Sequence, residues 1–566
     1  MEQTINRLEL HWVDKYKEVK LEPRILIEDK EKSYGDPNSE NMLIHGDNLL
    51  ALKALEKDYA GMVKCVYIDP PYNTGNAFEH YDDFKEHSIW LNLIYSRLSV
   101  IYKLISNDGF LFIQLDSNEL HYCKIILDQI FGRKNFVNQI SYERSAVSGI
   151  GQGASIVTTG EYILIYKKEN AYLNEVSNYI ELDLKTMKRY NKILVDEFIS
   201  KSNEKPVKVF KHKDYKIDTI SFKEYDKNKK KIDKEYISNY DNLFRTFLIQ
   251  KENSFQQDII KNMEKDNLYS IEYTPSRGKN KDKNTNLYYL NNELIGWLKD
   301  SACKIDNKIL KTSKLTNIWT HAQIPKADLP NEGGVSFPRN KKPEQLIKRI
   351  LELSTNEGDL VLDSFLGSGT TAAVAHKMGR RWIGIEMGDH CYSHCLKRLK
   401  DVVDGEQSGI SKSVNWNGGR GFKFYELAPS LLKHDKFGNL VIDDKYNYEM
   451  LINAMCKLEG FNYDPDSELF WKQGYSYEKD YIFVTTNFMT SEYLDAIHND
   501  MKVNESLLIC CKAYNKSCED RYPNINIKKI PQELFGKCEF DKDNYNLNII
   551  EPKEIDENNE EDIDNE

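Results

Sequence analysis

The sequence lacks any run of about eighteen consecutive apolar residues, the length that a membrane-spanning helix needs. Its first residues also lack the basic stretch followed by an apolar one that marks a secretion signal. Its ten cysteines are scattered, and none belongs to a Cys-x-x-Cys pair, so the common disulfide frameworks and zinc patterns are excluded. We therefore expect a cytoplasmic protein with reduced thiols, no membrane association and no metal site.

Positive charge is scarce over the whole chain, where 78 Lys and Arg face 89 Asp and Glu for a formal net charge of −11. The balance changes along the sequence. Residues 201–320 contain 25 basic and 17 acidic side chains, whereas the last sixteen residues contain nine acidic and one basic. An acidic tail thus masks a basic middle. Such a middle is typical of DNA binding, but a solvated lysine-rich surface is the commoner cause.

The most informative stretch is residues 63–74. Residues 63–68 are mostly apolar, with β-branched and aromatic side chains, and predict a buried strand. The strand must end at Asp69, because Pro70 and Pro71 have no N–H to give to a sheet. Asp69 and the Pro70 carbonyl are rigid acceptors, and Tyr72 offers an aromatic face. This suits a planar base with an amino group, such as an adenine rotated out of a duplex; a proline-terminated strand with a turn-capping Asp is the structural alternative.

A second informative stretch joins a predicted strand, residues 360–362, to a predicted helix, residues 371–378. It reads Asp363-Ser364-Phe365-Leu366-Gly367-Ser368-Gly369-Thr370. The two glycines allow a tight turn and close approach of a ligand, and the helix start offers free N–H groups. Glu386 ends the next predicted strand, where an acid can accept from ribose hydroxyls. With no third glycine and no Gly-Lys-Thr, the pattern favours a nucleoside without a phosphate, such as S-adenosylmethionine, over a purely structural turn.

Strand–helix–strand patterns occur in both of these regions, which predicts an α/β fold with a parallel sheet. In the first pattern Asp47 and Asn48 follow a short strand at residues 42–45. A single Rossmann-like sheet results only if the strand order is circularly permuted. The glycine strand then lies between the strands that end at Glu386 and Asp69, and Asp47 lies at the adenine end of the ligand. Cofactor and target sites would share one edge of the sheet.

With these motifs in this order and a variable insert between them, the chain resembles the β class of DNA amino-methyltransferases. Gly46-Asp47-Asn48 and Lys342-Pro343-Glu344 match flanking cofactor motifs of that class. Residues 69–75, 418–427 and 531–548 resemble, more narrowly, the modification subunits of type III restriction–modification systems. In this class, Asp-Pro-Pro-Tyr occurs mostly in enzymes that methylate N6 of adenine. Ser at the first position of the motif occurs in enzymes that methylate N4 of cytosine.

The resemblance implies a fold, a cofactor and a set of site residues. The fold is a Rossmann-like methyltransferase fold with a mixed seven-stranded, circularly permuted sheet, and the cofactor is S-adenosylmethionine. The implied catalytic residues are Asp69, Pro70, Pro71 and Tyr72. The implied cofactor-binding residues are Asp47, Asn48, Lys342, Pro343, Asp363, Phe365, Gly367, Ser368, Gly369, Thr370 and Glu386.

The same resemblance divides the chain into parts and assigns it an activity. The expected parts are a charged amino-terminal segment (1–40), the catalytic half (41–167), an inserted target-recognition domain (168–330), the cofactor half (331–428), an α+β dimer or partner region (429–550) and a disordered acidic tail (551–566). The implied activity is site-specific methylation of adenine N6. Double-stranded DNA, a second copy of the chain and a helicase–nuclease restriction subunit are the expected partners. Three alternatives stay open: N4-cytosine methylation on the same scaffold, an RNA substrate, or a role mainly in DNA specificity and assembly.

Overall fold

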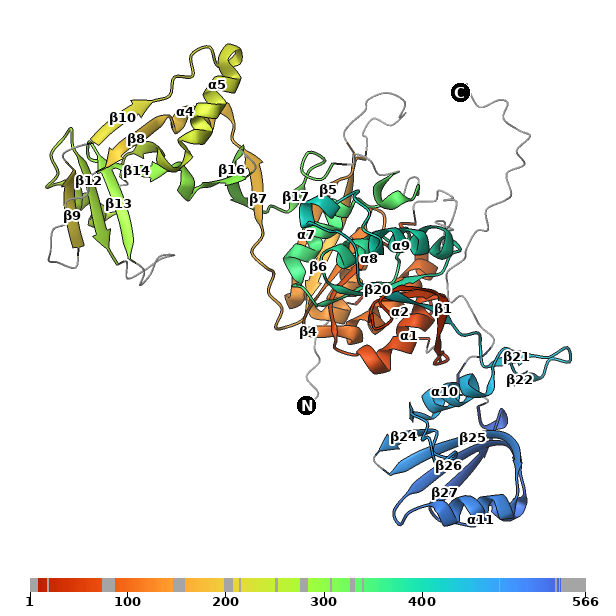
Figure 1. Ribbon diagram of the computed structural model, residues 1–566. Helices are drawn as coiled ribbons and strands as arrows, with labels where there is room; N and C mark the ends of the chain where they lie inside the picture. The colour runs from red at the N-terminus through yellow and green to blue at the C-terminus, as the bar shows by residue number, and fades with distance from the viewer. Residues whose placement is uncertain are drawn as a thin grey trace, which may run out of the picture. The chain divides into compact units, whose positions relative to one another are not determined.

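The computed structural model (Figure 1) describes residues 9–540 except 18–19, 74–86, 146–157, 198–206, 213–214, 250–252, 275–283, 306–307, 326–330, 338–340, 478, 535–536 and 539. The acidic tail expected over 551–566 lies outside the described residues. Contacts divide the chain into two compact units. The first combines Met1–Asn174 with Asn317–Glu566, and the second is Glu175–Thr316.

A ten-stranded sheet forms the centre of the first unit, in the order β1-β20-β2-β19-β18-β3-β4-β6-β5-β17. The seven strands from β2 to β5 in this order form the expected mixed methyltransferase sheet. Three strands that were not expected, β1, β20 and β17, extend its two edges. In spatial order the strands are β1 (Leu26–Gly35), β20 (Gly421–Leu427), β2 (Met42–His45), β19 (Arg381–Glu386), β18 (Leu360–Asp363), β3 (Val63–Ile68), β4 (Ile105–Leu115), β6 (Gly160–Lys167), β5 (Phe136–Glu143) and β17 (Ile318–Trp319).

The permuted strand order is confirmed. β18 pairs in parallel with β19 on one side and with β3 on the other, and Leu362 lies opposite Val66 in the β18–β3 register. β6 runs antiparallel to both β4 and β5. The strands buried at the centre are short and apolar. Ile44, Val66 and Leu362 are completely buried, and burial of each such side chain contributes about 1.5–3 kcal/mol.

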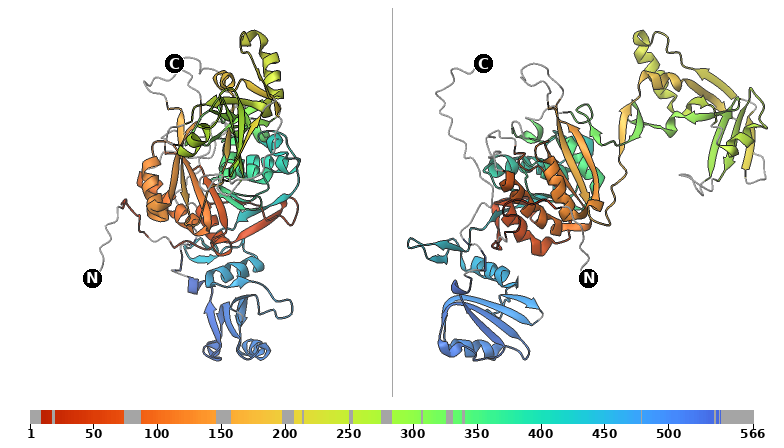
Figure 2. Two further views of the ribbon diagram at one scale, coloured as in Figure 1. Left: turned by 90° about the vertical axis from the view of Figure 1, so that its left-hand side faces the viewer. Right: turned by 180° about the vertical axis from the view of Figure 1, so that it is seen from behind.

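Helices cover both faces of this sheet, with the orange and the teal helices on opposite sides of it in the left view of Figure 2. Local chemistry explains where several of them begin. Asp47 accepts from the backbone N–H groups of Leu49 and Leu50 and so caps α1, and Pro343 occupies the cap position of α7. The helices are α1 (Asn48–Tyr59), α2 (His87–Leu104), α3 (Leu120–Leu127), α7 (Glu344–Ser354), α8 (Thr370–Lys377) and α9 (Lys397–Val403).

The described part of the amino-terminal segment is built into the first unit. β1 pairs antiparallel with β20. The Trp12 indole donates to Asn92 Oδ1 at 2.7 Å. The buried Arg24 guanidinium donates to Glu22 at 2.8 Å and to the Ala428 carbonyl at 2.9 Å. The charged composition of residues 1–40 gave no indication of this strand, because β1 lies at an edge and is only half buried.

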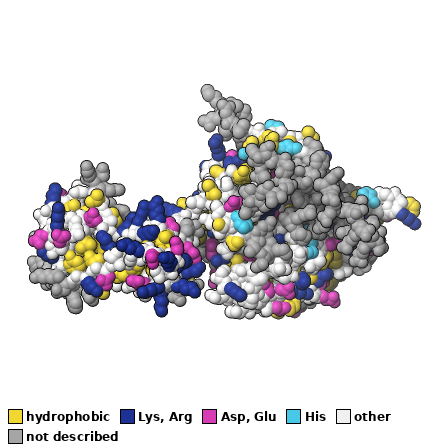
Figure 3. Space-filling model, turned by 90° about the horizontal axis from the view of Figure 1, so that it is seen from above, with side chains coloured by type: hydrophobic (Ala, Val, Ile, Leu, Met, Phe, Trp, Pro, Cys, Tyr) yellow, Lys and Arg dark blue, Asp and Glu magenta, His cyan; other side chains and the backbone are white. Residues whose placement is uncertain are grey.

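The second unit contains two antiparallel sheets. The seven-stranded sheet has the order β10-β8-β11-β14-β13-β12-β9, and the three-stranded sheet has the order β15-β16-β7. Lys and Arg side chains are spread over the face of this unit seen in Figure 3. Its elements are β7 (Ser177–Glu181), α4 (Leu184–Arg189), β8 (Lys192–Glu197), β9 (Val207–His212), β10 (Tyr215–Thr219), α5 (Tyr225–Ser238), β11 (Leu243–Phe247), α6 (Ser254–Ile260), β12 (Leu268–Tyr273), β13 (Thr285–Leu290), β14 (Glu293–Trp297), β15 (Ala302–Ile305) and β16 (Lys308–Lys314).

The carboxy-terminal region is α+β, as expected. A five-stranded sheet has the order β23-β24-β25-β26-β27, with β25, β26 and β27 parallel. A separate hairpin, β21–β22, precedes it. The elements are β21 (Leu432–His434), β22 (Leu440–Ile442), α10 (Tyr448–Glu459), β23 (Asn462–Tyr463), β24 (Gly474–Tyr477), β25 (Asp480–Met489), α11 (Ser491–Asp500), β26 (Ser506–Tyr514) and β27 (Ile525–Lys529).

Two features are absent from the described residues. No helix in that part of the chain is long and apolar enough to cross a membrane. Its His, Cys, Asp and Glu side chains form no group of three or more that could hold a metal ion.

Candidate active site

Four parallel strands, β2, β19, β18 and β3, end at one edge of the large sheet. The predicted residues lie at these strand ends: Glu386 and Asp363 are the last residues of β19 and β18, and Asp47 and Asp69 come just after β2 and β3. The ends of β18 and β3 are neighbours in the sheet, and the charge of Asp69 acts on Asp363. Two motifs almost 300 residues apart in the chain thus meet at one edge.

The Asp69 carboxylate is held by two donors. Lys342 Nζ lies 3.0 Å from Oδ2, and the Tyr72 hydroxyl donates to Oδ1. Burial raises the pKa of Asp69 above its ordinary value, although the Lys342 cation opposes that shift. The Lys342 ammonium also lies 5.1 Å from the centre of the Tyr72 ring. Lys342, which the cofactor motif had implied as a cofactor ligand, therefore lies against the Asp-Pro-Pro-Tyr carboxylate.

Glu161 joins this group and was not predicted. Its Oε2 lies 3.2 Å from Lys342 Nζ and 3.2 Å from the Tyr72 hydroxyl oxygen. Gln114 donates to the same oxygen, and Arg144 Nη1 donates to Oε1 at 3.1 Å. Burial works to raise the pKa of Glu161, but Lys342 and Arg144 outweigh it, and the pKa is lowered. The only signal in the sequence was an acid at the start of the otherwise apolar strand β6.

The backbone of the Asp-Pro-Pro-Tyr segment is anchored from α2. The Trp90 indole N–H donates to the Pro71 carbonyl at 2.7 Å, and the Trp90 side chain is completely buried. The two fixed proline φ angles and this hydrogen bond hold the Pro70 carbonyl in one orientation. The four predicted catalytic residues therefore form a rigid segment.

The glycine turn after β18 leaves open space. Gly367 has φ +58, and a Cβ added there would meet nothing within 4 Å. Gly369 has φ +82, and a Cβ there would lie 3.4 Å from the Cys395 Cα. Positive φ strongly favours glycine at both positions. Thr370 begins α8 directly after the turn, so the free N–H groups of the helix start are in this place.

Glu386 ties the end of β19 to the glycine turn. Its Oε2 accepts from the Gly367 N–H at 2.7 Å, and its Oε1 accepts from the Gly388 N–H at 3.0 Å. The His390 Nε2 lies 3.0 Å from Oε1, and both side chains are buried. Burial lowers the pKa of His390, but the Glu386 carboxylate outweighs it, and the pKa is raised.

Asp363 and Asn48 shape the other side of the turn. Asp363 accepts from the Phe365 N–H at 2.9 Å and from the Thr371 hydroxyl at 2.6 Å. Burial raises the pKa of Asp363 to about 7. Asn48 Nδ2 donates to the Ser364 carbonyl at 2.7 Å, and Arg97 Nε in turn donates to Asn48 Oδ1 at 2.6 Å.

Unsatisfied polar atoms remain beside this open space. Within the described part of the chain, Asp47 Oδ2 and the Ser364 hydroxyl are buried and make no hydrogen bond, although Arg97 Nη2 lies 3.6 Å from Asp47 Oδ2. Buried polar atoms are normally satisfied, so such atoms require an explanation. A ligand with hydroxyl or amino groups would supply partners. The residues at this edge therefore fit a nucleoside such as that of S-adenosylmethionine.

A buried ionic network supports the turn from behind. Arg398 Nη1 donates to the Thr370 hydroxyl at 2.7 Å, and Arg398 Nη2 donates to Glu344 Oε1 at 2.8 Å. Lys377 Nζ donates to Glu344 Oε2 at 2.8 Å. Glu344 follows Lys342-Pro343, so this network connects that motif to the glycine turn. Removing one member would leave an uncompensated buried charge, at a cost of about 3–5 kcal/mol.

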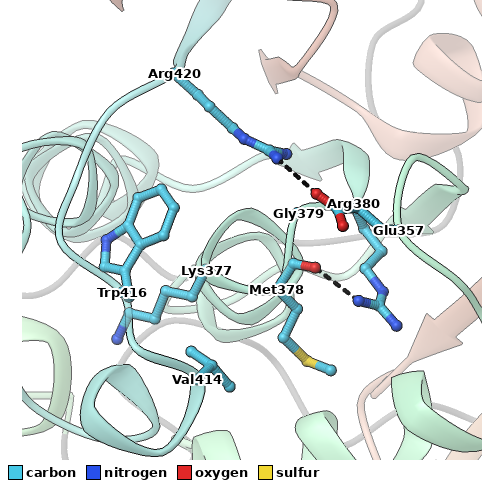
Figure 4. Close-up of a pocket in the computed structure, with 8 residues that line it drawn as sticks. All are labelled: Glu357, Lys377, Met378, Gly379, Arg380, Val414, Trp416 and Arg420. Carbon is cyan, nitrogen blue, oxygen red and sulfur yellow. Dashed lines mark hydrogen bonds and ion pairs between the residues drawn. The ribbon is translucent and has the colours of Figure 1, made fainter.

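A cavity of about 280 Å³ lies at the far end of α8, away from the glycine turn (Figure 4). Arg420 and Glu357 form an ion pair across its rim at 3.2 Å. None of the residues predicted for catalysis or cofactor binding lines it. Its lining residues are Glu357, Lys377, Met378, Gly379, Arg380, Val414, Trp416 and Arg420.

Comparison of the sequence with known proteins assigns the chain to a family. The DNA methylase family N6_N4_Mtase matches residues 63–397. The type III HindVI Mod subunit of Haemophilus influenzae is 38% identical over 449 residues, which are 76% of this chain and 59% of that protein. The type III EcoP15I Mod subunit of Escherichia coli is 25% identical over 498 residues, or 77% of this chain and 74% of that protein.

The chain is shorter than these relatives, spanning 59% of the length of the HindVI subunit and 58% of the EcoPI Mod subunit of Escherichia phage P1. Among solved structures, the M1.HpyAVI–SAM complex is 16% identical, with a TM-score of 0.28 over 63% of this chain and 100% of that one. The family match extends from the Asp69 strand through the glycine turn to the helix after Glu386. This chain belongs to the N6_N4_Mtase family of DNA methylases.

Proposed function

We propose that this chain is the modification subunit of a type III restriction–modification system. It would transfer a methyl group from S-adenosylmethionine to N6 of an adenine rotated out of double-stranded DNA. The observation that carries the proposal is the adjacency of β3 and β18, because it brings the Asp69 acceptor and the open glycine turn to one edge. The type III Mod relatives support the choice of system.

The residues at the end of β3 would act on the target base. An exocyclic amino group is a poor nucleophile, since its lone pair is delocalised into the ring. Asp69 and the Pro70 carbonyl would accept from its two N–H bonds and leave the lone pair free to attack. As the amino nitrogen takes the methyl group that the cofactor would supply, Asp69 would accept the surplus amino proton and pass it to solvent. Stacking on Tyr72 would offset about 1–3 kcal/mol of the cost of base rotation.

The residues around the glycine turn would hold the cofactor. S-adenosylmethionine supplies, when bound, an electrophilic methyl group on a sulfonium. The backbone of Gly367, Ser368, Gly369 and Thr370 would border the nucleoside, and Glu386 would face the ribose. Asp47, Asn48, Asp363, Phe365 and Pro343 would complete the site.

The remaining parts of the chain would bind DNA and partners. The basic composition of the insert and the Lys and Arg side chains on the second unit support its assignment as the target-recognition domain. A second copy of the chain would bind through the carboxy-terminal region. A restriction subunit would supply the helicase and nuclease activities that the motifs of this chain do not include.

The decisive test is methyl transfer by the full chain. We expect tritium from methyl-labelled S-adenosylmethionine to enter DNA taken from cells without this gene. Nuclease digestion and chromatography of the product should identify N6-methyladenine. N4-methylcytosine, or transfer to RNA instead, would assign the chain to one of those alternatives. DNA binding without transfer would leave the specificity and assembly role.

The Asp69→Ala variant tests the role of the carboxylate. We expect its methyl transfer to fall by at least a hundredfold, because one of the two acceptors for the amino group is gone. Its affinity for S-adenosylmethionine, measured by calorimetry, should stay within about twofold of the unmodified chain. Full activity of this variant in the tritium assay would refute the assignment.

A further inference from the structure

Lys342 lies between two carboxylates that belong to different strands. Its Nζ is 3.0 Å from Asp69 Oδ2, after β3, and 3.2 Å from Glu161 Oε2, on β6. Its side chain is only 11% exposed. One ammonium group thus forms ion pairs with two carboxylates in a largely buried place. The attraction between opposite charges is much stronger there than in water.

This arrangement bears on the proposed reaction, because the target amino group would meet an Asp69 that already has two donors. Asp69 must accept a hydrogen bond from the target amino group, yet one of its oxygens is paired with Lys342 and the other accepts from the Tyr72 hydroxyl. The incoming amino group would compete with these two donors for the lone pairs of the carboxylate. A donor that moves aside would need another acceptor in this largely buried place, because a buried ammonium without a partner is strongly disfavoured.

Glu161 has the geometry of that second acceptor. Its Oε2 is already 3.2 Å from Lys342 Nζ and 3.2 Å from the Tyr72 hydroxyl oxygen. Gln114 donates to the same Oε2 and Arg144 donates to Oε1, so the carboxylate is held in place. Because Glu161 is 5% exposed and held in place, both donors can turn towards it with small movements.

We propose that Glu161 is a positioning residue that takes over Lys342 and the Tyr72 hydroxyl when the target amino group binds Asp69. The inference rests on the proposed function. Lys342 acts as the counter-ion that keeps Asp69 ionised before the base arrives. Glu161 lets that cation release Asp69 without losing its partner. Neither residue contacts the methyl donor in this role.

The charges around Asp69 set the expected pH behaviour. Lys342 lowers the pKa of Asp69, whereas burial and the charge of Glu161 raise it. The other ionisable groups that face this cluster are Tyr67 and Tyr72, Asp363 after β18, and Tyr142 and Arg144 at Glu161. Asp69 must be ionised to accept, so methyl transfer falls as the pH drops through its pKa.

In a plot of kcat/KM against pH, the decline at low pH is called here the acid limb. Glu161→Gln and Lys342→Met should move it in opposite directions. Glu161→Gln removes a negative charge and leaves Lys342 on Asp69. We expect the acid limb of kcat/KM to move to lower pH while the plateau falls by at least tenfold. Lys342→Met leaves Asp69 without its cation, so the limb should move to higher pH. A residue that only supports the fold would leave the acid limb unchanged, and a Glu161 that acts on Asp69 by its charge alone would leave the plateau unchanged.

The experiment uses the full chain and a duplex that contains the site mapped with the unmodified protein. kcat/KM is measured by tritium transfer from pH 5.5 to 9. Calorimetry with S-adenosylmethionine should give a Kd within about threefold of the unmodified chain for both variants, which shows that they are folded. Glu505→Gln is the matched control, because Glu505 pairs with Lys472 at 2.7 Å in the carboxy-terminal region; its pH profile should be unchanged.

The outcomes separate the two proposals. If the unmodified chain transfers no methyl group to any nucleic acid, the proposed function fails. If it does transfer, but the acid limbs of both variants coincide with that of the unmodified chain, the role of Glu161 is refuted. A full plateau for Glu161→Gln would refute it as well. Should Lys342→Met not fold, the limb shift and the plateau of Glu161→Gln still decide.

Discussion

At the scale of single residues, burial controls the acids of the proposed site. Asp363 and Glu161 are buried and the Asp69 side chain is 20% exposed, and their pKa values move in different directions. The pKa of Asp69 and Asp363 is raised, whereas that of Glu161 is lowered by Lys342 and Arg144. Sequence alone treats these acids as equivalent, because their difference depends on which cations the fold places beside them.

Asp363→Asn should remove a dependence of stability on pH. Burial raises the pKa of Asp363 to about 7, above its unfolded value near 4. Between about pH 4 and pH 7 the unfolded chain therefore releases this proton and the folded chain keeps it, so the contribution of Asp363 to stability declines as the pH rises. Asparagine has the same shape and does not ionise.

The measurement is urea unfolding of both proteins at pH 5 and pH 8, followed by tryptophan fluorescence. We expect Asp363→Asn to gain stability over the original chain by about 1–4 kcal/mol more at pH 8 than at pH 5. An equal difference at the two pH values would show that Asp363 is ionised throughout this range.

At the scale of elements, the turn between β18 and α8 is built around glycine backbone. Gly367 combines positive φ with open space on its Cβ side, and its N–H binds Glu386 from β19. The strand–turn–helix order was predictable from the sequence, because apolar periodicity and glycine are local signals. The unexpected edge strand β1 gave no such signal, since its pairing with β20 joins residues about 400 positions apart in the chain.

Gly367→Ala should weaken cofactor binding beyond the cost of strain. At φ +58 an alanine adds about 1–2 kcal/mol of backbone strain, and its methyl group would also enter the proposed nucleoside space. Gly61→Ala is the matched control, because Gly61 has φ +71 and nothing within 4 Å of its Cβ. It follows α1 and belongs to no proposed site.

Calorimetry with S-adenosylmethionine and thermal unfolding compare the two variants. Both should lose similar stability. Only Gly367→Ala should lose affinity for the cofactor, by at least tenfold. Equal affinities would place the nucleoside elsewhere.

At the scale of the whole molecule, charge is distributed unevenly. The net charge is −11, but residues 201–320 have an excess of basic side chains. Helix α5 of the second unit shows the arrangement: Ile232 and Tyr236 are buried, while the lysines of the helix are exposed. DNA binding by this unit would therefore depend strongly on salt. The exposed lysines are Lys227, Lys229, Lys230, Lys231 and Lys234.

Changing Lys229, Lys230 and Lys231 to alanine tests this surface. We expect weaker binding to duplex DNA, and a plot of log K against log salt that is less steep by about 0.9 for each phosphate that the variant no longer neutralises. Affinity for S-adenosylmethionine should not change.

Fluorescence anisotropy between 50 and 300 mM salt measures the slope. Alanines at three exposed lysines of the carboxy-terminal region control for the change in net charge. An unchanged slope for the α5 variant would exclude this helix from the DNA interface. The control positions are Lys445, Lys512 and Lys516.

The sequence by itself determined the strands that end at Asp69 and Glu386 and the glycine turn. These follow from apolar periodicity, proline and glycine, which act over a few residues. Only the tertiary structure decided that Lys342 faces Asp69 and that Glu161 joins them. Such contacts depend on which strand ends meet at a sheet edge, and residues 69, 161 and 342 become neighbours only when β3, β6 and the segment before α7 are packed together.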